Sequence, residues 1–387
     1  MSGLFRRLAE HAELSYESAV LLPPEAYTSV EMLDAERTHL FAREWLCAGR
    51  TADLVNAGDY LTVDVPSGQP GVDHHSVIII RDEHGELGAF ANVCVHRCAT
   101  LLQGCGAVAR ITCPYHAWVY RLDGQLIAAP YMHRTVDAIG RPFNTSDHHL
   151  QRLLLEVREG FLYVNADPTA LPLGPRLEGL SAVVGRYRMA GYLPVASGVD
   201  EWDTNWKCLA ENFMDAYHVF KVHRGTFAAD GDSTATTTVY PGTDAYAYHV
   251  AVDDPASSHG IAHADNVVLD GTWRHTTALA AVFPHHVMQI QADWLWYLAL
   301  SPVGAGRVRI RWNVAVAPEQ LAAQADPQRY VKEVLGLLER VNAEDRPVVE
   351  GVYRGLQRID ARRGPFSYLE RNVYDFDRYV AHRVSRP

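Results

Sequence analysis

Two cysteines and two histidines stand in two short segments that could close around one metal centre. Cys94-Val95-His96 is followed, after sixteen residues, by Cys113-Pro114-Tyr115-His116. Each segment supplies one thiolate and one imidazole. A [2Fe–2S] centre of mixed ligation requires this set, because two thiolates bind one iron and two imidazoles bind the other. Imidazole in place of thiolate raises the reduction potential, which suits a cluster that passes single electrons onward.

A tetrahedral zinc site is the alternative for these four residues, because two Cys and two His also satisfy zinc. Zinc fingers usually pair like with like, as C-x₂₋₄-C with H-x₃₋₅-H. Here each segment contributes one residue of each kind, which is the ligand order of a Rieske centre. The pattern therefore favours iron–sulfur over zinc.

A second group of ligating residues lies in the segment 205–223. Asp215 and His218 are three residues apart, so both would share one face of a helix. His218 and His223 are five apart, so we expect the helix to bend or end between them if both are to meet one ion. Two His and one remote carboxylate form the facial triad of non-haem Fe(II) oxygenases, which leaves positions open for O₂ and substrate.

Both groups together resemble one family. The runs Cys94-Val95-His96-Arg97 and Cys113-Pro114-Tyr115-His116-Ala117-Trp118, followed by Asp123-Gly124, look like the cluster loops of Rieske non-haem iron oxygenase α subunits. The segment 211–223 is similar to the family's D-x-x-H-x-x-x-x-H element, including Glu-Asn before it and Tyr before the first His. The resemblance implies that Cys94, His96, Cys113 and His116 hold a Rieske cluster.

The same resemblance assigns roles in the second group. It makes His218 and His223 ligands of a mononuclear iron. It makes Asp215 the bridging carboxylate that hydrogen-bonds a cluster histidine of the neighbouring subunit and carries the electron path. Asp215 could also be a plain acceptor that orients His218, as metal-bound imidazoles usually require. The two roles are compatible.

The third iron ligand is implied to be an acid more than a hundred residues downstream, near the start of a C-terminal helix. Asp345, in the run from Asn342 to Pro347, is the predicted ligand. An alternative is that Asp345 is a helix N-cap with Pro347 in the first turn. Its rivals as the ligand are Glu344, Asp293 and Asp360.

Cys98 departs from the family pattern, where Gly commonly follows His-Arg. A loop-locking disulfide of the respiratory Rieske kind cannot form, because Tyr115 stands where the partner Cys would be. We expect the remaining cysteines to be free and buried: Cys47, Cys98, Cys105 and Cys208.

Composition narrows the class of protein. The chain has 387 residues, 48% of them hydrophobic and 21% charged, which predicts two or three domains with a substantial core. The net charge of −11 and the absence of a basic run argue against a nucleic-acid or anionic-membrane partner. The N-terminal run lacks the apolar core of a signal peptide, and no stretch has the length of a membrane span, so a cytoplasmic protein is expected.

The predicted fold class is α+β. Residues 45–155 are expected to form an all-β Rieske [2Fe–2S] domain, and residues 1–44 and 156–387 a catalytic domain with an antiparallel sheet covered by helices, of the helix-grip type. Thr28-Ser29-Val30-Glu31 reads as a capping box that opens a helix with the apolar stripe Leu33, Leu40, Phe41 and Trp45. Asp123-Gly124 predicts a hairpin, and residues 154–165 a single strand. Further helices are expected at 206–223, 327–342 and 347–359.

The resemblance implies an O₂-dependent oxygenase that uses electrons from NAD(P)H through a separate flavin or iron–sulfur reductase, or a ferredoxin. No GxGxxG fingerprint with a βαβ unit is evident, so the chain itself should not bind the nicotinamide. The family assembles as a head-to-tail trimer, so a homotrimer is expected. The sixteen-residue spacing and the CPYHAW loop look more like the monooxygenase and demethylase branch of the family, which implies monooxygenation or oxidative dealkylation of a small organic substrate.

Three alternatives stay open at this point. Asp-Ala-Tyr-His-Val also resembles the ring-dihydroxylating branch, which would make the protein an aromatic cis-dihydroxylating dioxygenase. A Rieske electron carrier and a zinc-stabilised binding module belong to other classes. The strands that line the family's cavity are rich in residues that could cage a quaternary ammonium group, pack an aromatic ring or simply build the core: Trp273, Phe283, His285, His286, Met288, Trp294, Trp296 and Tyr297.

Overall fold

The chain divides into two compact units in the computed structural model, which describes residues 3–136, 139–228, 233–257 and 259–385. The small unit consists of Cys47–Val65 and His74–Leu171. The large unit consists of Met1–Leu46, Pro66–Asp73 and Pro172–Pro387. Among the described residues, all α-helices belong to the large unit. The predicted α+β class, an all-β domain beside a sheet covered by helices, is confirmed.

The small unit is built from two antiparallel sheets. The larger has the order β1-β10-β9-β4-β3-β2-β5 and the smaller has the order β6-β7-β8. Branched and aromatic side chains such as Ile78, Phe90 and Tyr120 form its core, together with the buried thiols Cys94 and Cys113. The strands are β1 (Leu46–Arg50), β2 (Asp59–Pro66), β3 (His74–Arg81), β4 (Leu87–Ala91), β5 (Cys105–Ala107), β6 (Ile111–Thr112), β7 (Val119–Tyr120), β8 (Leu126–Ala128), β9 (Arg152–Arg158) and β10 (Phe161–Asn165).

The large unit is organised around one antiparallel sheet with the order β11-β17-β16-β15-β14-β13-β12. Nearly every side chain of β15 and β16 is buried, so helices and loops must cover both faces of the sheet centre. The strands are β11 (Leu193–Trp202), β12 (Thr237–Tyr240), β13 (Tyr246–Val252), β14 (Thr276–Val282), β15 (His286–Ile290), β16 (Trp294–Pro302) and β17 (Val308–Val316).

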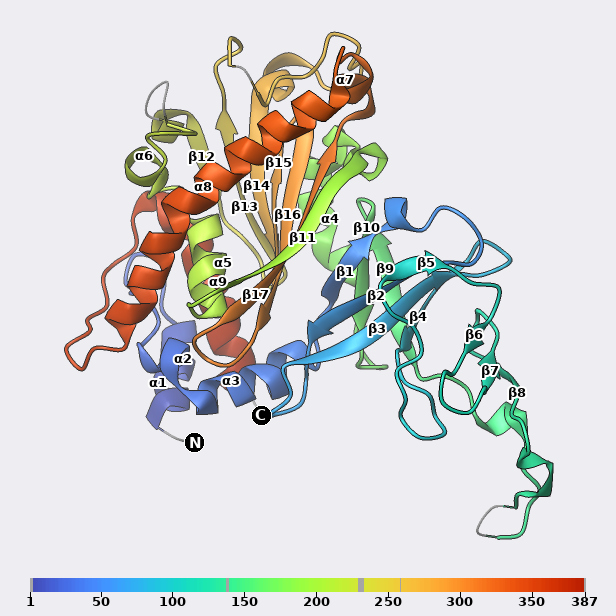
Figure 1. Cartoon of the computed structure of the whole chain (residues 1–387). Helices are drawn as coiled ribbons and strands as arrows, with labels where there is room; N and C mark the ends of the chain where they lie inside the picture. Colours follow the sequence, from blue (N-terminus) through green and yellow to red (C-terminus); the bar gives the residue numbers. More distant parts are fainter. Residues whose placement is uncertain (1–2, 137–138, 229–232, 258, 386–387) are drawn as a thin grey trace. The chain divides into compact units, whose positions relative to one another are not determined.

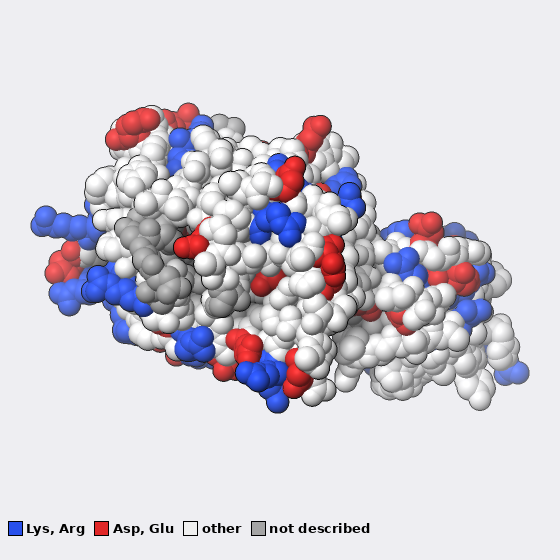
Figure 2. Space-filling view, turned by 90° about the horizontal axis from the view of Figure 1, so that it is seen from above, with Lys and Arg blue, Asp and Glu red and all other residues white. Residues whose placement is uncertain are grey.

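Helices α5 and α8 lie across one face of this sheet (Figure 1). Within the described ranges, every helix is too short or too polar to span a membrane. On the face drawn in Figure 2, acidic and basic side chains are interspersed in small groups. The helices are α1 (Gly3–Ala12), α2 (Glu25–Thr28), α3 (Val30–Glu36), α4 (Leu173–Val184), α5 (Trp206–Met214), α6 (Val219–Val222), α7 (Pro318–Ala322), α8 (Pro327–Leu356) and α9 (Arg371–Ser385).

Helix α8 corrects one prediction. Two helices separated before Pro347 were expected, but α8 continues through this proline for a total of 30 residues. Its buried side chains, from Val334 to Tyr353, recur every three or four residues, which is the period of a helix packed on a sheet. Asp345 falls in this buried register, between Val341 and Val349. The alternative that Asp345 is an N-cap is therefore wrong, because Asp326 caps this helix.

Two local predictions were also displaced. The N-cap of α3 is Ser29, whose side chain accepts a hydrogen bond from the Met32 N–H, so the expected capping box starting at Thr28 is wrong by one residue. The segment 154–165 holds two strands rather than one. Glu159 and Gly160 take φ values of 49° and 80°, and such a pair of left-handed residues closes a tight hairpin between β9 and β10.

Candidate active site

Two histidines flank a single turn of helix after α5. Helix α5 ends at Met214 because Asp215 takes an extended conformation. His218 and His223 then bracket α6 as its two end residues. The break that was predicted between the histidines lies instead between Met214 and His218. One helical turn is therefore enough to bring both imidazoles to the same place.

Asp345 completes a group of three ligating side chains with these histidines. Nε2 of His218 lies 3.2 Å from Nε2 of His223. Oδ1 of Asp345 lies 3.5 Å and 3.3 Å from these two nitrogens. In the described ranges, no other three His, Cys, Asp or Glu residues bring ligand atoms within 4.8 Å of one another. A triangle of this size matches one face of an octahedron with bonds of about 2.3 Å, so the residues fit a mononuclear iron with open positions.

The rival acids lie elsewhere or act differently. Asp293 is buried, and both of its carboxylate oxygens accept from the Gly260 N–H at 3.1 Å. Asp360 is exposed and paired with Arg358 at 2.9 Å. Glu344 lies beside the site, but it faces the far nitrogen of an imidazole. The geometry thus favours Asp345 as the third ligand.

Each histidine has its own carboxylate on the nitrogen that points away from the triangle. Nδ1 of His218 lies 3.3 Å from Oδ2 of Asp215. Nδ1 of His223 lies 2.9 Å from Oε2 of Glu344, which also accepts from the Thr226 hydroxyl at 2.6 Å. Such partners fix the tautomer and the orientation of a metal-bound imidazole. They leave both Nε2 atoms for an ion.

The electrostatics of the triangle favour a cation. Burial alone lowers the pKa of His218, but hydrogen bonds and charges from Asp215 and Asp345 raise it to about 10. The amide of Asn212 lies 3.3 Å from Oδ1 of Asp345 and 3.4 Å from Nε2 of His218. The same two carboxylates would also attract a metal cation bound at these nitrogens.

Two loops of the small unit carry the four residues predicted to hold the cluster. The two loops have the same pattern of backbone hydrogen bonds and the same φ value at one equivalent position. In the first loop the Cys98 N–H donates to the Cys94 carbonyl at 2.9 Å, and φ is 55° at residue 98. In the second the Ala117 N–H donates to the Cys113 carbonyl at 3.1 Å, and φ is again 55° at residue 117. The Cys94 N–H donates to the Ala99 carbonyl, and the Cys113 N–H donates to the Trp118 carbonyl, both at 2.8 Å. Two related turns thus present one Cys and one His each.

The side chains of these loops fit a binuclear cluster. The rings of His96 and His116 lie 4.7 Å apart, and their Nδ1 atoms are buried without a protein partner. Burial raises the pKa of the Cys94 thiol and the nearby Cys113 thiol raises it further, whereas the Tyr120 hydroxyl, 3.2 Å from the Cys94 sulfur, lowers it. Buried nitrogens and thiols of this kind are left unsatisfied unless a metal group binds them.

A tetrahedral zinc site is disfavoured by the same geometry. Ligand atoms around one zinc lie only about 3.3–3.8 Å from one another. No three of Cys94, His96, Cys113 and His116, all of which are described, have ligand atoms within 4.8 Å of one another. The spacing is too wide for one ion and suits a group that spans two iron atoms.

The other cysteines form no disulfide, but not all of them are buried. Cys47 and Cys208 are buried, whereas Cys98 and Cys105 are exposed. The expectation of burial was wrong for these two. Cys98 follows the outward turn of the cluster loop, and Cys105 starts β5 at the edge of its sheet.

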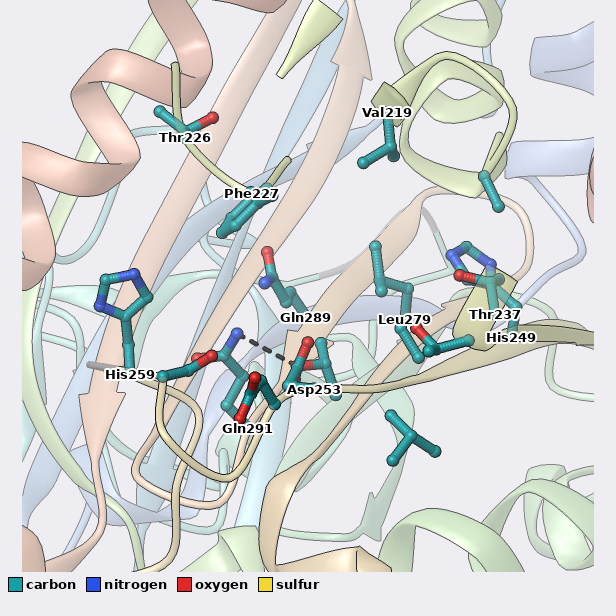
Figure 3. Close-up of a pocket in the computed structure, with 17 residues that line it drawn as sticks. Val219, Thr226, Phe227, Thr237, His249, Asp253, His259, Leu279, Gln289 and Gln291 are labelled. Atoms are coloured by element: carbon teal, nitrogen blue, oxygen red, sulfur yellow. Dashed lines mark hydrogen bonds between the residues drawn. The ribbon is translucent and has the colours of Figure 1, made fainter. Parts of the chain in front are cut away.

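A cavity of about 300 Å³ opens beside the segment that carries the two histidines. Val219, Thr226 and Phe227 of this segment line one end of it (Figure 3). The Phe227 ring lies 5.6 Å from the His223 ring, so one lining side chain of the cavity packs beside the candidate iron site. The remaining described lining residues come from loops and from strands β12 to β15: Ala216, Thr236, Thr237, His249, Ala251, Val252, Asp253, Asp254, Ser257, His259, Thr277, Leu279, Gln289 and Gln291.

Three uses were left open for the eight residues singled out in the sequence, and none of the eight is among the described cavity residues. Gln289 and Leu279 are paired neighbours on the cavity face of the sheet. Met288 and its partner Tyr297 point to the opposite face, since side chains alternate along a strand. Trp296 shares the cavity face but packs on Phe213 of α5 at 5.6 Å. The aromatic side chains build the core instead.

Comparison with known families decides the identity. Residues 188–386, just over half of the chain, match the family model of the ring hydroxylating alpha subunit (catalytic domain). Residues 44–145 match the Rieske [2Fe–2S] domain. The chain belongs to the Rieske ring-hydroxylating α subunits. The cofactors of this oxygenase family are a Rieske [2Fe–2S] cluster and a mononuclear iron, as predicted from the sequence.

Named relatives of this Rieske oxygenase act on quaternary ammonium compounds. The carnitine monooxygenase oxygenase subunit of Escherichia coli K12 is 32% identical over 212 residues, 54% of each chain. The match spans about half the length of the first curated relatives. The chloroplastic choline monooxygenase of Arabidopsis thaliana is 24% identical over 387 residues, covering 96% of this chain and 85% of the relative.

Solved structures share the fold. The quaternary ammonium Rieske monooxygenase CntA in complex with L-carnitine has a TM-score of 0.77 at 23% identity, over 97% of this chain and 98% of that one. Naphthalene 1,2-dioxygenase from Rhodococcus sp. also has a TM-score of 0.77, at 20% identity, over 99% of this chain and 98% of that one. At these identities the likeness shows the fold of a Rieske oxygenase and no more.

Sequence reasoning missed several side chains of this Rieske oxygenase site. Glu344 was considered only as a rival ligand, and the contact of Asn212 with Asp345 was not foreseen. Tyr120 was not singled out, although its hydroxyl lies 3.2 Å from the Cys94 sulfur. The buried helical register of α8 was the one available indication of the site on that helix, because a lone acid among Val341 and Val349 must have a buried partner.

Proposed function

We propose that this chain is the oxygenase subunit of a multi-component monooxygenase that hydroxylates or oxidatively dealkylates a quaternary ammonium compound. The single observation that carries the proposal is a 2-His-1-carboxylate triangle next to a cavity in a chain that also has a Rieske domain. The names of the carnitine, glycine betaine and choline monooxygenase relatives support the substrate class. The carboxylate of Asp253 in the cavity supports a cationic substrate.

We assign the metal ligands on the geometry described above. The small unit would be the Rieske domain expected at residues 45–155, and the large unit the catalytic domain expected at 1–44 and 156–387. When bound, the cluster supplies single electrons and the iron supplies O₂ activation. The proposed ligands are Cys94, His96, Cys113 and His116 for the cluster and His218, His223 and Asp345 for the iron.

The chain's own side chains would hold this chemistry in place. Glu344 holds Nδ1 of His223 at 2.9 Å, and Asp215 lies 3.3 Å from Nδ1 of His218, so that both Nε2 atoms stay directed at one point. Asn212 lies within 3.3 Å of the Asp345 oxygen and limits its rotation. Phe227 and Val219 exclude water on the cavity side of the triangle.

Electron delivery would involve partners. We propose that a flavin or iron–sulfur reductase, or a ferredoxin, passes electrons from NAD(P)H to the cluster. We further propose a head-to-tail homotrimer in which Asp215 bridges to a cluster histidine of the neighbouring subunit. In the structure, Asp215 Oδ1 accepts the Tyr217 N–H at 2.6 Å while Oδ2 faces His218. A cytoplasmic location stays a prediction.

An aromatic cis-dihydroxylating dioxygenase is the second candidate, because naphthalene 1,2-dioxygenase has the same fold. The cavity argues against it. Its described lining carries Asp253, Gln289 and Gln291 besides one phenyl ring, whereas an unsubstituted aromatic ring would leave such groups without partners. A pure electron carrier needs neither the triangle nor the cavity.

The test is a substrate screen with metal-loaded protein and a surrogate reductase. Choline, glycine betaine and L-carnitine would be compared with naphthalene by coupled NADH and O₂ consumption and by product analysis. The proposal predicts substrate-dependent O₂ uptake with at least one quaternary ammonium compound. Turnover of naphthalene alone, or protein with iron only in its cluster, would contradict it.

A further inference from the structure

The end of the cavity away from Val219 and Thr226 is formed by a connected polar group (Figure 3). The Thr277 hydroxyl donates to Oδ2 of Asp253 at 2.6 Å. The amide of Gln291 donates to the Thr277 oxygen at 3.2 Å. Thr277 and Gln291 are almost fully buried, at 4% exposure each, so this arrangement is built into the sheet rather than formed by mobile surface side chains.

The direction of these hydrogen bonds fixes the Gln291 amide. Thr277 has one hydroxyl proton, and a carboxylate can only accept it. Gln291 must therefore present its NH₂ group to the Thr277 oxygen, which turns Oε1 the other way. Oε1 is buried and has no protein partner. A buried amide oxygen of this kind is costly unless a ligand or water donates to it.

A second lining residue is also an acceptor. The Asn372 amide donates to the Tyr240 carbonyl at 2.8 Å, so its oxygen faces Nδ1 of His249 at 3.2 Å and takes a proton from it. Burial lowers the pKa of His249 to about 4, while the bond to Asn372 opposes this shift. The imidazole is neutral at pH 7, and Nε2 keeps its lone pair.

The carboxylates are the only permanently charged side chains among the described lining residues. Asp253 and Asp254 are among its lining residues, and the lining that the structure describes contains neither Lys nor Arg. Burial raises the pKa of Asp253, but the Thr277 hydroxyl and the charge of His275 lower it. A carboxylate on a bound molecule would therefore meet repulsion and no cationic partner in this lining.

We propose that Asp253 and the Oε1 atom of Gln291 determine substrate specificity, selecting a cation that carries a hydroxyl or N–H donor and rejecting one that carries a carboxylate. This inference rests on the proposed function and narrows its substrate class. Among trimethylammonium compounds, an alcohol such as choline meets the requirement, whereas the zwitterion glycine betaine does not. Tetramethylammonium has the charge but no donor.

The test measures dissociation constants of these three probes by calorimetry on the anaerobic, metal-loaded protein. We expect choline to bind more tightly than tetramethylammonium, and glycine betaine to bind most weakly. Asp253→Asn should weaken choline and tetramethylammonium about tenfold each and remove the discrimination against glycine betaine. Gln291→Met should weaken choline by about fivefold and leave tetramethylammonium unchanged, because the acceptor for the ligand's donor is lost while the charge of Asp253 stays.

The matched control is Asp265→Asn, which removes the same charge from an exposed position on the loop between β13 and β14. It should change every constant by less than about twofold. Thermal unfolding midpoints of all variants would confirm that the fold is kept. Preference for glycine betaine in the native protein, or unchanged probe ratios in Asp253→Asn, overturns the inference alone. Failure of all three probes to bind overturns the proposed substrate class together with it.

Discussion

The two candidate metal sites are built in opposite ways. All four residues proposed for the cluster lie within residues 94–116, on two turns whose backbone hydrogen bonds repeat each other. The iron triangle takes His218 and His223 from one turn of helix and Asp345 from a helix far along the chain. The first site is local and the second depends on tertiary packing. Substitutions at the cluster site should therefore act through the four ligands themselves. Substitutions at the iron site should also act through the neighbouring residues that position its ligands.

Cys113→Ser should have the largest effect. Serine is a poor ligand for iron in a thiolate site, so the cluster and its red-brown colour should be lost and turnover should fall at least about a thousandfold. Visible absorption, iron content and substrate-dependent O₂ uptake would measure this. Cys105→Ser, at an exposed position in the same unit, should keep all three. A fully active Cys113→Ser protein would end the assignment of the cluster.

Asp345→Asn tests the second site, the iron triangle, without changing the cluster loops. The amide removes the negative charge from the iron triangle, so mononuclear iron should be lost and turnover should fall at least about a hundredfold, while the cluster spectrum stays intact. Iron per chain would drop from three toward two, measured together with the spectrum. Asp360→Asn, at an exposed rival acid, serves as the control and should behave as the native protein. Retention of three irons by Asp345→Asn would restore Asp293 and Asp360 as candidates.

Asp215→Ala sharpens the comparison, because this residue is proposed to link the two sites. Both metals should stay bound, since His218 keeps its Nε2 position, but turnover should fall on the order of a hundredfold. Stopped-flow reoxidation of the reduced cluster should slow in parallel. A normal reoxidation rate with low turnover would leave Asp215 as an orienting acceptor only.

Glu344→Gln tests whether tertiary support matters for the iron triangle. The amide can still meet Thr226 but holds Nδ1 of His223 less strongly, so iron affinity or activity should fall about tenfold. Glu339→Gln, at an exposed position on the same helix, is the matched control. Equal behaviour of the two variants in an iron-competition assay would show that Glu344 has no positioning role.

Cys98→Gly should have the smallest effect and the opposite sign. Residue 98 has a φ of 55°, which glycine adopts without a steric penalty and other residues adopt at a cost of about 1 kcal/mol. The substitution should raise the free energy of unfolding by about 0.5 kcal/mol, because glycine also gives the unfolded chain more freedom. Denaturant unfolding would measure it, and Ala99→Gly, its neighbour, should destabilise. A destabilised Cys98→Gly protein would mean that the thiol makes a favourable contact.

The sequence was sufficient for the local site and only partly for the other. The ligand order of Cys94, His96, Cys113 and His116 alone predicted the Rieske loops, since local spacing decides which residues can meet. The iron histidines were also predictable, but the position of the helix break was not, because it depends on the conformation of Asp215 in the folded chain. Asp345 was predicted although its location in α8 was wrong, since Pro347 suggested a helix start.

The cavity could not be predicted in the same way. Aromatic residues of β15 and β16 satisfied the pattern of a substrate pocket, but the register of the sheet decides which face each side chain takes. Met288 and Gln289 are neighbours in the chain and point to opposite faces. Nothing in the local sequence of Thr277 indicated that its hydroxyl would contact both Asp253 and Gln291.

Glu344 and Asp345 are consecutive residues of α8, and Glu344 contacts Nδ1 of His223 while Asp345 contacts Nε2 of both histidines. Consecutive side chains on a helix differ by about 100° in direction, and one inserted or deleted residue rotates everything beyond it by that angle. A change of length between the start of α8 and Asp345 would turn both carboxylates away at once. Natural variants of this oxygenase are therefore expected to gain and lose residues in their loops, while the stretch from Asp326 to Asp345 keeps its length.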